Sequence, residues 1–238
     1  MPPAAQQETA PAILIAGASR GLGQGLAAAF ARRGWQVVGT VRGTGRTPLH
    51  ELADAHPGRV MVEALDIDDA GSIAGLRSRL DGRRLDMLFV NAGTTTRDQD
   101  VPVGLVSTEE FTRVMLTNAL GPMRVIELFQ DLVPVDGLIG AMSSGQGSIA
   151  NNEGGRREVY RASKAALNMS MRSFAAREAT SPRAMLLLAP GWIRTELGGA
   201  DAPYGLEESL PLLVDLMLAK RERPGLEYLD RFGRTVPW

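Results

Sequence analysis

Apolar runs alternate with amphipathic segments along most of the chain. The runs predict strands at 12–18, 35–41, 59–65, 85–93, 137–144 and 183–191, with a shorter one near 226–232. Helical spacing of apolar residues predicts helices at 21–34, 47–56, 68–80, 107–133, 157–179 and 206–220. Almost continuously apolar strands are typical of a parallel sheet that is buried on both faces by helices. With right-handed crossovers, this alternation predicts a doubly wound α/β fold.

The sequence contains no long linker and no internal repeat, so we expect a single domain over residues 11–238. Residues 1–10 are polar and rich in proline and alanine, which predicts a flexible N-terminal tail. The tail lacks the basic and apolar regions of a secretion signal. No apolar run reaches the length of a membrane-spanning helix. We therefore expect a cytoplasmic protein without a membrane partner.

Composition narrows the chemistry. The chain has 26 Lys and Arg against 27 Asp and Glu, a net charge of −1, and no long basic run, so a nucleic-acid partner is not expected. The absence of cysteine excludes disulfides, thiolate nucleophiles and cysteine-based zinc sites. The two histidines, His50 and His56, lie outside any ligand motif, which favours structural or solvated roles. No metal site is expected.

The first predicted strand leads into a glycine-rich turn, AGASRGLG (16–23), that opens the first predicted helix. Gly17 lets the chain turn sharply, while Gly21 and Gly23 let the backbone approach a phosphate and the helix pack on the strand. The helix N-terminus offers free N–H groups to a pyrophosphate. This placement favours a dinucleotide site over a turn with no ligand. The predicted cofactor contacts here are Gly17, Ser19, Arg20, Gly21, Leu22 and Gly23.

The end of the second predicted strand indicates which dinucleotide is bound. An acidic residue there would bind the ribose 2′-hydroxyl of NAD, but the position is Val41, followed by Arg42. Arg20 lies in the glycine turn. Two cations and no acid favour a 2′-phosphate, and hence NADP(H) over NAD(H). The alternative is that Arg42 is only a solvated loop residue.

Further motifs follow the later predicted strands, where open α/β sheets bind ligands. They are LDIDD (65–69), NAG (91–93), MSSGQG (142–147) and PGWIRT (190–195), with Asn118 and YRASK (160–164) on the two long helices. The order of the glycine turn, NAG, serine, YxxxK and PGxxxT resembles the short-chain dehydrogenase/reductase family over residues 12 to about 200. The wording of MSS, GSIANNEGG and PGWIRTELGG is similar to the C-factor-like members of that family.

The resemblance implies a Rossmann-like sheet of about seven strands in the order 3-2-1-4-5-6-7, and a homodimer or homotetramer. It implies that Tyr160 is the general acid/base, that Lys164 holds the nicotinamide ribose, that Ser144 binds the substrate carbonyl and that Asn118 holds a water in a proton relay. It also implies cofactor contacts from Asp66, Ile67, Asn91, Ala92, Gly93, Tyr160, Lys164, Pro190, Gly191, Trp192, Ile193 and Thr195.

The chemistry of YRASK can also be argued from its spacing. Reduction of a carbonyl leaves an alkoxide that needs a proton, and a free tyrosine, with a pKa of about 10, is a poor donor at neutral pH. Lys164 lies four residues after Tyr160, on the same helix face. We expect its ammonium to stabilise tyrosinate and lower the pKa of Tyr160. Alone, a YxxxK pair is more often plain helix surface.

The segment between Ser144 and Tyr160 is longer than is usual in the family, and we expect it to bulge near the substrate mouth. Asn151, Asn152, Arg156 and Arg157 are substrate contacts or solvated loop residues, and solvation is the simpler interpretation. Ser143 and Ser148 are rivals of Ser144. We expect residues 198–209 to form a lid, which Tyr204 or Trp192 could line.

Three functional hypotheses follow. The first is an NADPH-dependent oxidoreductase that acts on a small-molecule carbonyl or alcohol. The second is an NADP-binding, C-factor-like signalling protein with little or no turnover, which an intact Tyr–Lys–Ser–Asn set disfavours. The third is an acyl-chain ketoreductase, for which the sequence shows no basic patch to dock a carrier protein.

Overall fold

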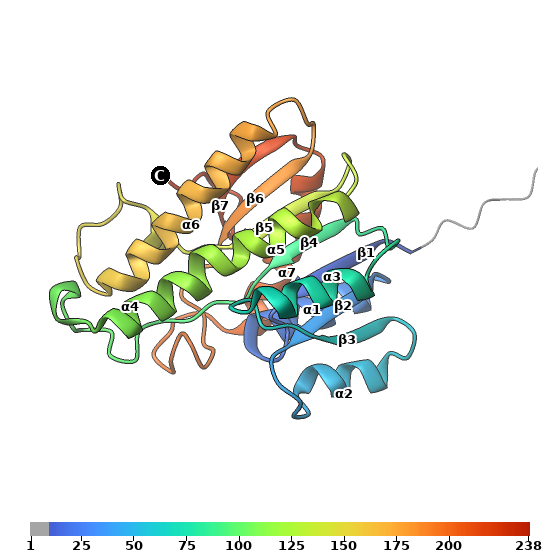
Figure 1. Ribbon diagram of the computed structural model, residues 1–238, viewed down its shortest axis with the longest axis horizontal. Coiled ribbons are helices and arrows are strands. Elements are labelled where there is room, and N and C mark those ends of the chain that lie inside the picture. The colour runs from blue at the N-terminus through green and yellow to red at the C-terminus, as the bar shows by residue number, and fades with distance from the viewer. Residues whose placement is uncertain (1–9) are drawn as a thin grey trace, which may run out of the picture.

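A parallel sheet of seven strands forms the centre of the computed structural model, which describes residues 10–238 (Figure 1). The strand order, β3-β2-β1-β4-β5-β6-β7, confirms the predicted one, and every neighbouring pair is parallel. The strands are β1 (Ala12–Ala16), β2 (Gln36–Val41), β3 (Val60–Ala64), β4 (Met87–Val90), β5 (Leu138–Met142), β6 (Ala184–Ala189) and β7 (Gly225–Asp230). The predicted tail falls on residues 1–9, outside the described residues, and on Ala10.

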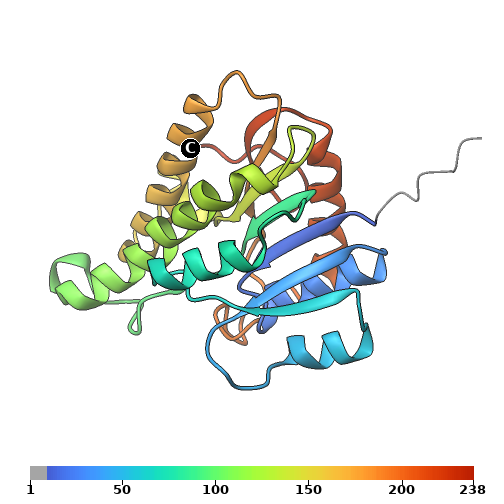
Figure 2. The same ribbon diagram turned by 45° about the vertical axis from the view of Figure 1, so that its right-hand side comes forward.

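Helices cover both faces of this sheet (Figure 2). One layer contains α1 (Gly21–Arg32), α2 (Pro48–Ala55) and α7 (Leu206–Arg221). The other contains α3 (Ala70–Arg79), α4 (Thr108–Met115), α5 (Gly121–Phe129) and α6 (Glu158–Arg177).

Alternate residues of the central strands serve the two layers. Ile13 and Ile15 pack with Leu26 of α1 and Leu213 of α7. Leu14, which points to the opposite face, joins the cluster formed with α3, α5 and α6. All four strand and helix side chains named for the first layer are fully buried. This two-sided burial explains why the strands read as continuous apolar runs.

The long helix predicted over 107–133 is wrong in one respect, because its middle is not α-helical. A π-helical turn at Leu116–Leu120 separates α4 from α5, and a 3-10 turn at Gln130–Leu132 ends the segment. Pro122 has no N–H and cannot donate to the carbonyl of Asn118, four residues earlier, as an α-helix requires. The irregular turn therefore lies where the α-helical ladder is interrupted, and π-helical turns often mark functional sites.

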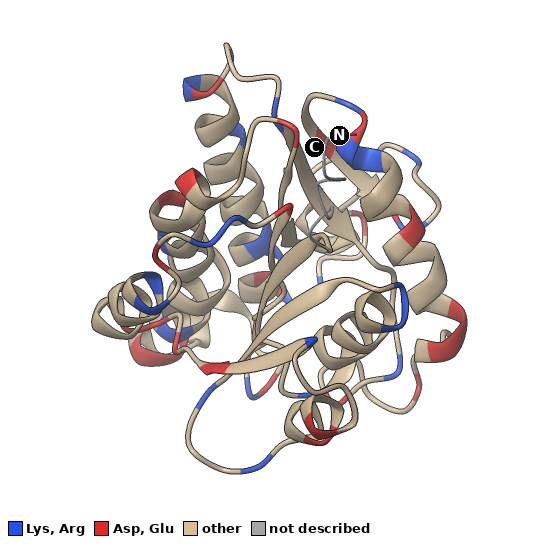
Figure 3. Cartoon of the chain, turned by 90° about the vertical axis from the view of Figure 1, so that its right-hand side faces the viewer, with Lys and Arg blue, Asp and Glu red and all other residues tan. Residues whose placement is uncertain are grey.

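No helix within residues 10–238 combines the length and apolarity needed to cross a bilayer. In the view of Figure 3, acidic and basic residues are interspersed along the chain. In the same described part of the chain, His, Asp and Glu residues form no cluster of three that could hold a metal ion. The cytoplasmic location stays a prediction.

Candidate active site

A cavity of about 1120 Å³ opens at the carboxyl ends of the strands. This volume slightly exceeds the roughly 300–1,000 Å³ typical of a site for one drug-sized ligand. Nearly all predicted site residues line it: Gly17, Ser19, Arg20, Gly21, Leu22, Arg42, Asp66, Ile67, Asn91, Ala92, Gly93, Ser144, Tyr160, Lys164, Pro190, Gly191, Trp192, Ile193 and Thr195. Gly23 and Asn118 do not reach the cavity wall.

The glycine turn between β1 and α1 is held by contacts that leave no room for side chains. Gly17 has a φ of +86°, its N–H donates to Thr40 Oγ1 at 2.9 Å, and its carbonyl accepts from Asn91 Nδ2 at 2.7 Å. A Cβ on Gly23 would lie 2.0 Å from the Gly17 carbonyl oxygen. Gly23 therefore allows the helix to approach the strand, whereas Gly17 and Gly21 face the cavity.

The α1 N-terminus has free hydrogen-bonding capacity beside the cavity. Arg20, its N-cap residue, makes no side-chain capping bond, and the first turn of the helix holds no acidic residue. Uncapped N–H groups and the positive end of the helix dipole suit an anion. Such a terminus fits the pyrophosphate that the glycine turn predicts.

The two arginines predicted at the adenine ribose differ in their surroundings. Arg42 is exposed, lines the cavity and has no carboxylate partner among residues 10–238. Arg20 forms an ion pair with Glu196 at 2.8 Å, and both side chains are 69% exposed. Thr40, in β2, also lines the cavity, although the motifs in the sequence did not point to it. Its position two residues before Arg42 is the only signal that could have found it.

Tyr160 and Lys164 lie on the first turns of α6, with the Lys164 Nζ 5.9 Å from the centre of the tyrosine ring. Lys164 is 3% exposed and donates to the Met142 carbonyl at 2.9 Å. Burial lowers the pKa of Lys164 to about 8. The pair is therefore a buried ammonium next to a phenol, at the wall of the cavity.

The expectation that the pKa of Tyr160 is lowered overall is wrong for this structure. Burial raises the pKa of Tyr160, while the Ser144 hydroxyl and the positive charge of Arg157 oppose this rise. The Lys164 ammonium donates to the Met142 carbonyl, and burial lowers the pKa of Lys164 itself. Desolvation of the phenolate therefore outweighs the neighbouring charges.

The three candidate serines have different surroundings. The Ser143 hydroxyl donates to Asn168 Oδ1 at 2.6 Å, and Ser148 is buried with its hydroxyl 3.4 Å from the Trp238 carbonyl. The Ser144 hydroxyl lies at the cavity near Tyr160 and accepts only from the N–H of Gln146 at 3.2 Å. Ser144 is therefore the candidate serine that both lines the cavity and interacts with Tyr160.

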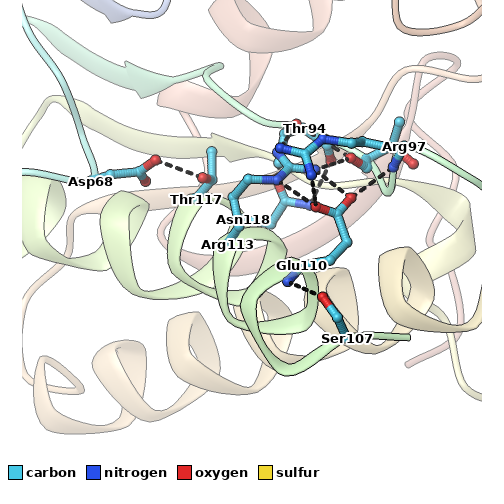
Figure 4. Close-up of polar contacts among 9 residues, drawn as sticks. Asp68, Thr94, Arg97, Ser107, Glu110, Arg113, Thr117 and Asn118 are labelled. Carbon is cyan, nitrogen blue, oxygen red and sulfur yellow. Dashed lines mark hydrogen bonds and ion pairs between the residues drawn. The ribbon is translucent and has the colours of Figure 1, made fainter. Parts of the chain in front are cut away.

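Asn118 connects the loop after β4 to α6 (Figure 4). Its Oδ1 accepts from the Thr94 N–H at 2.7 Å, and its Nδ2 donates to the Thr94 carbonyl at 2.8 Å and to Ser163 Oγ at 2.9 Å. Ser163 Oγ in turn donates to the Tyr160 carbonyl at 2.8 Å. The Asn118 amide thus links Thr94 to α6 through Ser163, and its role in holding a water stays a prediction.

A second group of residues, which no sequence motif indicated, lies beside Asn118 (Figure 4). Arg113 donates to Glu110 at 2.9 and 2.8 Å, to Thr94 Oγ1 at 2.9 Å and to the Thr95 carbonyl at 2.8 Å. Hydrogen bonds from Arg113 are the main cause that lowers the pKa of Glu110 to about 2. Opposite charges three residues apart after a Ser107 cap were the available signal.

At the mouth of the cavity, one of the four loop residues departs from the simpler interpretation of solvation. Arg157 lines the cavity, whereas Asn151, Asn152 and Arg156 are exposed away from it. Trp192, which was expected to line the lid at 198–209, lines the cavity and donates to the Gly198 carbonyl at 2.6 Å. The Tyr204 ring instead stacks on the Arg231 guanidinium, 3.3 Å from the ring centre.

Comparisons with known proteins agree with this geometry. A family model described as enoyl-(acyl carrier protein) reductase matches residues 17–210. A protein from Burkholderia multivorans, described as a short-chain dehydrogenase/reductase and solved with bound NADP, is 62% identical, with a TM-score of 0.95 over 97% of this chain and 100% of that one.

Two further relatives are more distant. A carbonyl reductase from Pseudomonas aeruginosa PAO1, in complex with NADP, is 35% identical, with a TM-score of 0.86 over 97% of this chain and 100% of that one. The C-signal protein of Myxococcus xanthus is 31% identical over 156 residues, which are 65% of this chain and 93% of that protein. The predicted likeness to the C-factor-like members thus has a counterpart among the relatives.

Proposed function

The chain belongs to the short-chain dehydrogenase/reductase family, and from this premise we propose that it is an NADPH-dependent carbonyl reductase, with alcohol oxidation as the reverse reaction. One observation carries the proposal: Tyr160, Lys164 and Ser144 line the same cavity as the glycine turn and Arg42. A proton donor and a dinucleotide cradle in one cavity support hydride transfer rather than storage of a nucleotide.

The residues present fit a phosphorylated dinucleotide. The uncapped N-terminus of α1 would hold the pyrophosphate, and Arg42, with no carboxylate partner in the described part of the chain, would hold a 2′-phosphate. Asp66 and Ile67 would contact the adenine, and residues 190–195 would flank the nicotinamide. When bound, the nicotinamide supplies a hydride to the carbonyl carbon of the substrate.

Residues of the protein supply the proton and stabilise the charge that its transfer leaves. Tyr160, whose raised pKa keeps it protonated at neutral pH, donates its proton to the carbonyl oxygen as negative charge develops there. Ser144 donates a hydrogen bond to the same oxygen. Lys164, mostly protonated below its pKa of about 8, stabilises the tyrosinate that is left. Asn118 fixes the backbone of α6 below Tyr160 through Ser163.

Replacement of the proposed donor tests this function. Tyr160→Phe removes one oxygen and keeps the ring, so we expect NADPH to bind unchanged while kcat falls by about 10² to 10⁴. NADPH oxidation with a panel of aldehydes and ketones measures this. Full activity in the Phe variant would disprove the role of Tyr160. No turnover in either protein, with biological function retained by the variant, would favour the signalling hypothesis.

Cofactor preference is tested by titration with NADPH and NADH, followed by cofactor fluorescence. We expect NADPH to bind at least about tenfold more tightly, which is about 1.4 kcal/mol. Arg42→Ala should remove most of this difference without weakening NADH. Equal binding of the two cofactors by the unaltered protein would show that Arg42 is only a surface residue.

The proposal also assigns dinucleotide binding and catalysis to one domain, residues 11–238, because the glycine turn and residues of α6 line the same cavity. The partner is a small carbonyl or alcohol compound. The expected homodimer or homotetramer stays a prediction.

A further inference from the structure

Arg157 has an unusual backbone conformation at the entrance to the cavity. Its φ of 59° and ψ of 43° are left-handed, and it is the only residue other than glycine with a positive φ in residues 10–238. Glycine would adopt this conformation without strain, and Gly154 and Gly155 precede it nearby. Strained residues concentrate at ligand-binding sites, so a large cation here calls for a functional reason.

Arg157 lines the cavity, and its guanidinium has no ion-pair partner in the described part of the chain. Its neighbours are committed elsewhere: Arg156 lies 3.7 Å from Asp100, and the Glu158 carboxylate accepts from the Val103 N–H at 3.0 Å. Two other arginines that line the cavity, Arg97 and Arg113, both pair with Glu110. The substrate end therefore keeps an uncompensated positive charge.

Other polar atoms at this end of the cavity also lack protein partners. They are Thr95 Oγ1, Gln99 Oε1 and Gln146 Oε1, all buried and all on residues that line the cavity. Buried polar atoms without hydrogen bonds are unfavourable unless a ligand or water binds them. The wall thus suits a polar substrate better than a purely aliphatic one.

We propose that the substrate is a polar carbonyl compound that carries an anionic group, and that Arg157 binds this group while Tyr160 and Ser144 bind the carbonyl. The inference rests on the proposed carbonyl reductase function and narrows its substrate class. Arg157 lies one helical turn before Tyr160, close enough for its charge to influence the phenol. An anion on Arg157 therefore places the rest of a small molecule next to the proton donor.

The test compares ligands that differ in charge alone. Benzoate and benzamide are titrated calorimetrically into the protein saturated with NADP⁺, and 4-carboxybenzaldehyde and its neutral methyl ester are compared as substrates. The test variant is Arg157→Gly, which relieves the left-handed strain and should fold. Its control is Arg156→Gly, the same substitution at the adjacent exposed residue outside the cavity.

We expect benzoate to bind at least about tenfold more tightly than benzamide. Arg157→Gly should abolish this difference, and it should lower kcat/KM for the carboxylate aldehyde about tenfold more than it lowers kcat/KM for the ester. Arg156→Gly should leave both unchanged. Lack of a charge preference in the unaltered protein, or its survival in Arg157→Gly, would overturn the inference.

The two proposals fail in different ways. Reduction of both aldehydes with equal kcat/KM would keep the carbonyl reductase function and remove the anion site. Arg157-dependent binding of benzoate without reduction of either aldehyde would keep the anion site and count against the reductase function.

Discussion

Asn118 and Thr94 hold each other through two hydrogen bonds, from the Thr94 N–H to Asn118 Oδ1 at 2.7 Å and from Asn118 Nδ2 to the Thr94 carbonyl at 2.8 Å. The pairing resembles a rung of a β-ladder, with a side-chain amide in place of one strand. It fixes the loop that follows Gly93 to the π-helical turn below it. A Cβ on Gly93 would lie 3.3 Å from Asn118 Oδ1 and 3.4 Å from Lys164 Nζ, so the loop, the amide and the lysine are in close contact.

Asn118→Ala should therefore damage both stability and turnover. The substitution leaves the N–H and carbonyl of Thr94 without partners in a partly buried site, at about 1 to 3 kcal/mol for such groups. We expect the free energy of unfolding to fall by about 2 kcal/mol in urea, and kcat to fall while the KM for NADPH changes little. Thr112→Ala, on the exposed side of α4, is the control. Equal stability of the two variants would contradict the pairing.

Glu110 should give the fold a stability that depends on pH. Its pKa is lowered from 4.5 to about 2, so the folded protein holds the ionised form more strongly than the unfolded chain does. The resulting stabilisation is fully present above about pH 5.5 and is lost as pH falls toward 2. One pKa unit corresponds to about 1.4 kcal/mol, and we expect roughly 2 to 3 kcal/mol at neutral pH.

Glu110→Gln measures this contribution. Urea unfolding of the variant and the unaltered protein should differ most at pH 7 and progressively less at pH 4 and below. Glu109→Gln removes the same charge from an exposed neighbour in the same turn and should have a smaller effect. A difference between Glu110→Gln and the unaltered protein that does not change with pH would show that the carboxylate charge is not the cause.

Much of the fold was predictable because the apolar runs, the glycine turn and the order of the motifs all indicate the same fold. Apolar runs such as AILIA give β1, and the glycines that follow fit a turn in which a Cβ would collide with backbone. The order of motifs then placed most site residues around one cavity. The pattern did not predict the π-helical turn, because Leu116–Leu120 keeps helical spacing. Pro122 was visible in the sequence, but a proline does not by itself show which kind of helical turn precedes it.

Ion pairs and hydrogen bonds between distant segments could not be predicted either. Whether Arg20 is free or paired depends on Glu196, far along the chain, and the direction of the pKa shift of Tyr160 depends on how deeply α6 is buried. Spacing places Lys164 on the same helix face as Tyr160, but it does not show that the Met142 carbonyl accepts from its ammonium. These facts belong to tertiary structure, where burial and local charges compete.

The buried ammonium of Lys164 should lower the free energy of unfolding, although the proposed reaction needs it. Its pKa is lowered from 10.5 to about 8, so the folded protein binds the proton less well than the unfolded chain. The penalty is fully present below about pH 8 and disappears as pH rises above 10.5. We expect Lys164→Met to abolish turnover but to raise the free energy of unfolding at pH 7 by roughly 1 to 3 kcal/mol, and by less at pH 10.

Lys220 provides the contrasting variant, because it is the only other lysine in the sequence. It is fully buried, but it donates to the Gly225 carbonyl at 2.8 Å and pairs with Glu227 at 3.2 Å. Lys220→Met leaves these partners unsatisfied and should destabilise the protein. If both lysine variants lower stability equally, burial is not what shifts the pKa of Lys164.

Glu196 should weaken cofactor binding by competing for Arg20. Their ion pair at 2.8 Å joins the glycine turn to the segment after β6, and both residues line the cavity. An exposed pair contributes about 0.2 to 1 kcal/mol, so freeing Arg20 by Glu196→Gln should tighten NADPH by about two- to fivefold. The affinity for NADH, which has no 2′-phosphate, should rise less.

Glu207→Gln, exposed on α7 and outside the cavity, is the control and should change the Kd of neither cofactor. Salt should reduce the gain, because it screens exposed charges. Weaker NADPH binding by Glu196→Gln would instead show that Glu196 holds Arg20 in its binding position.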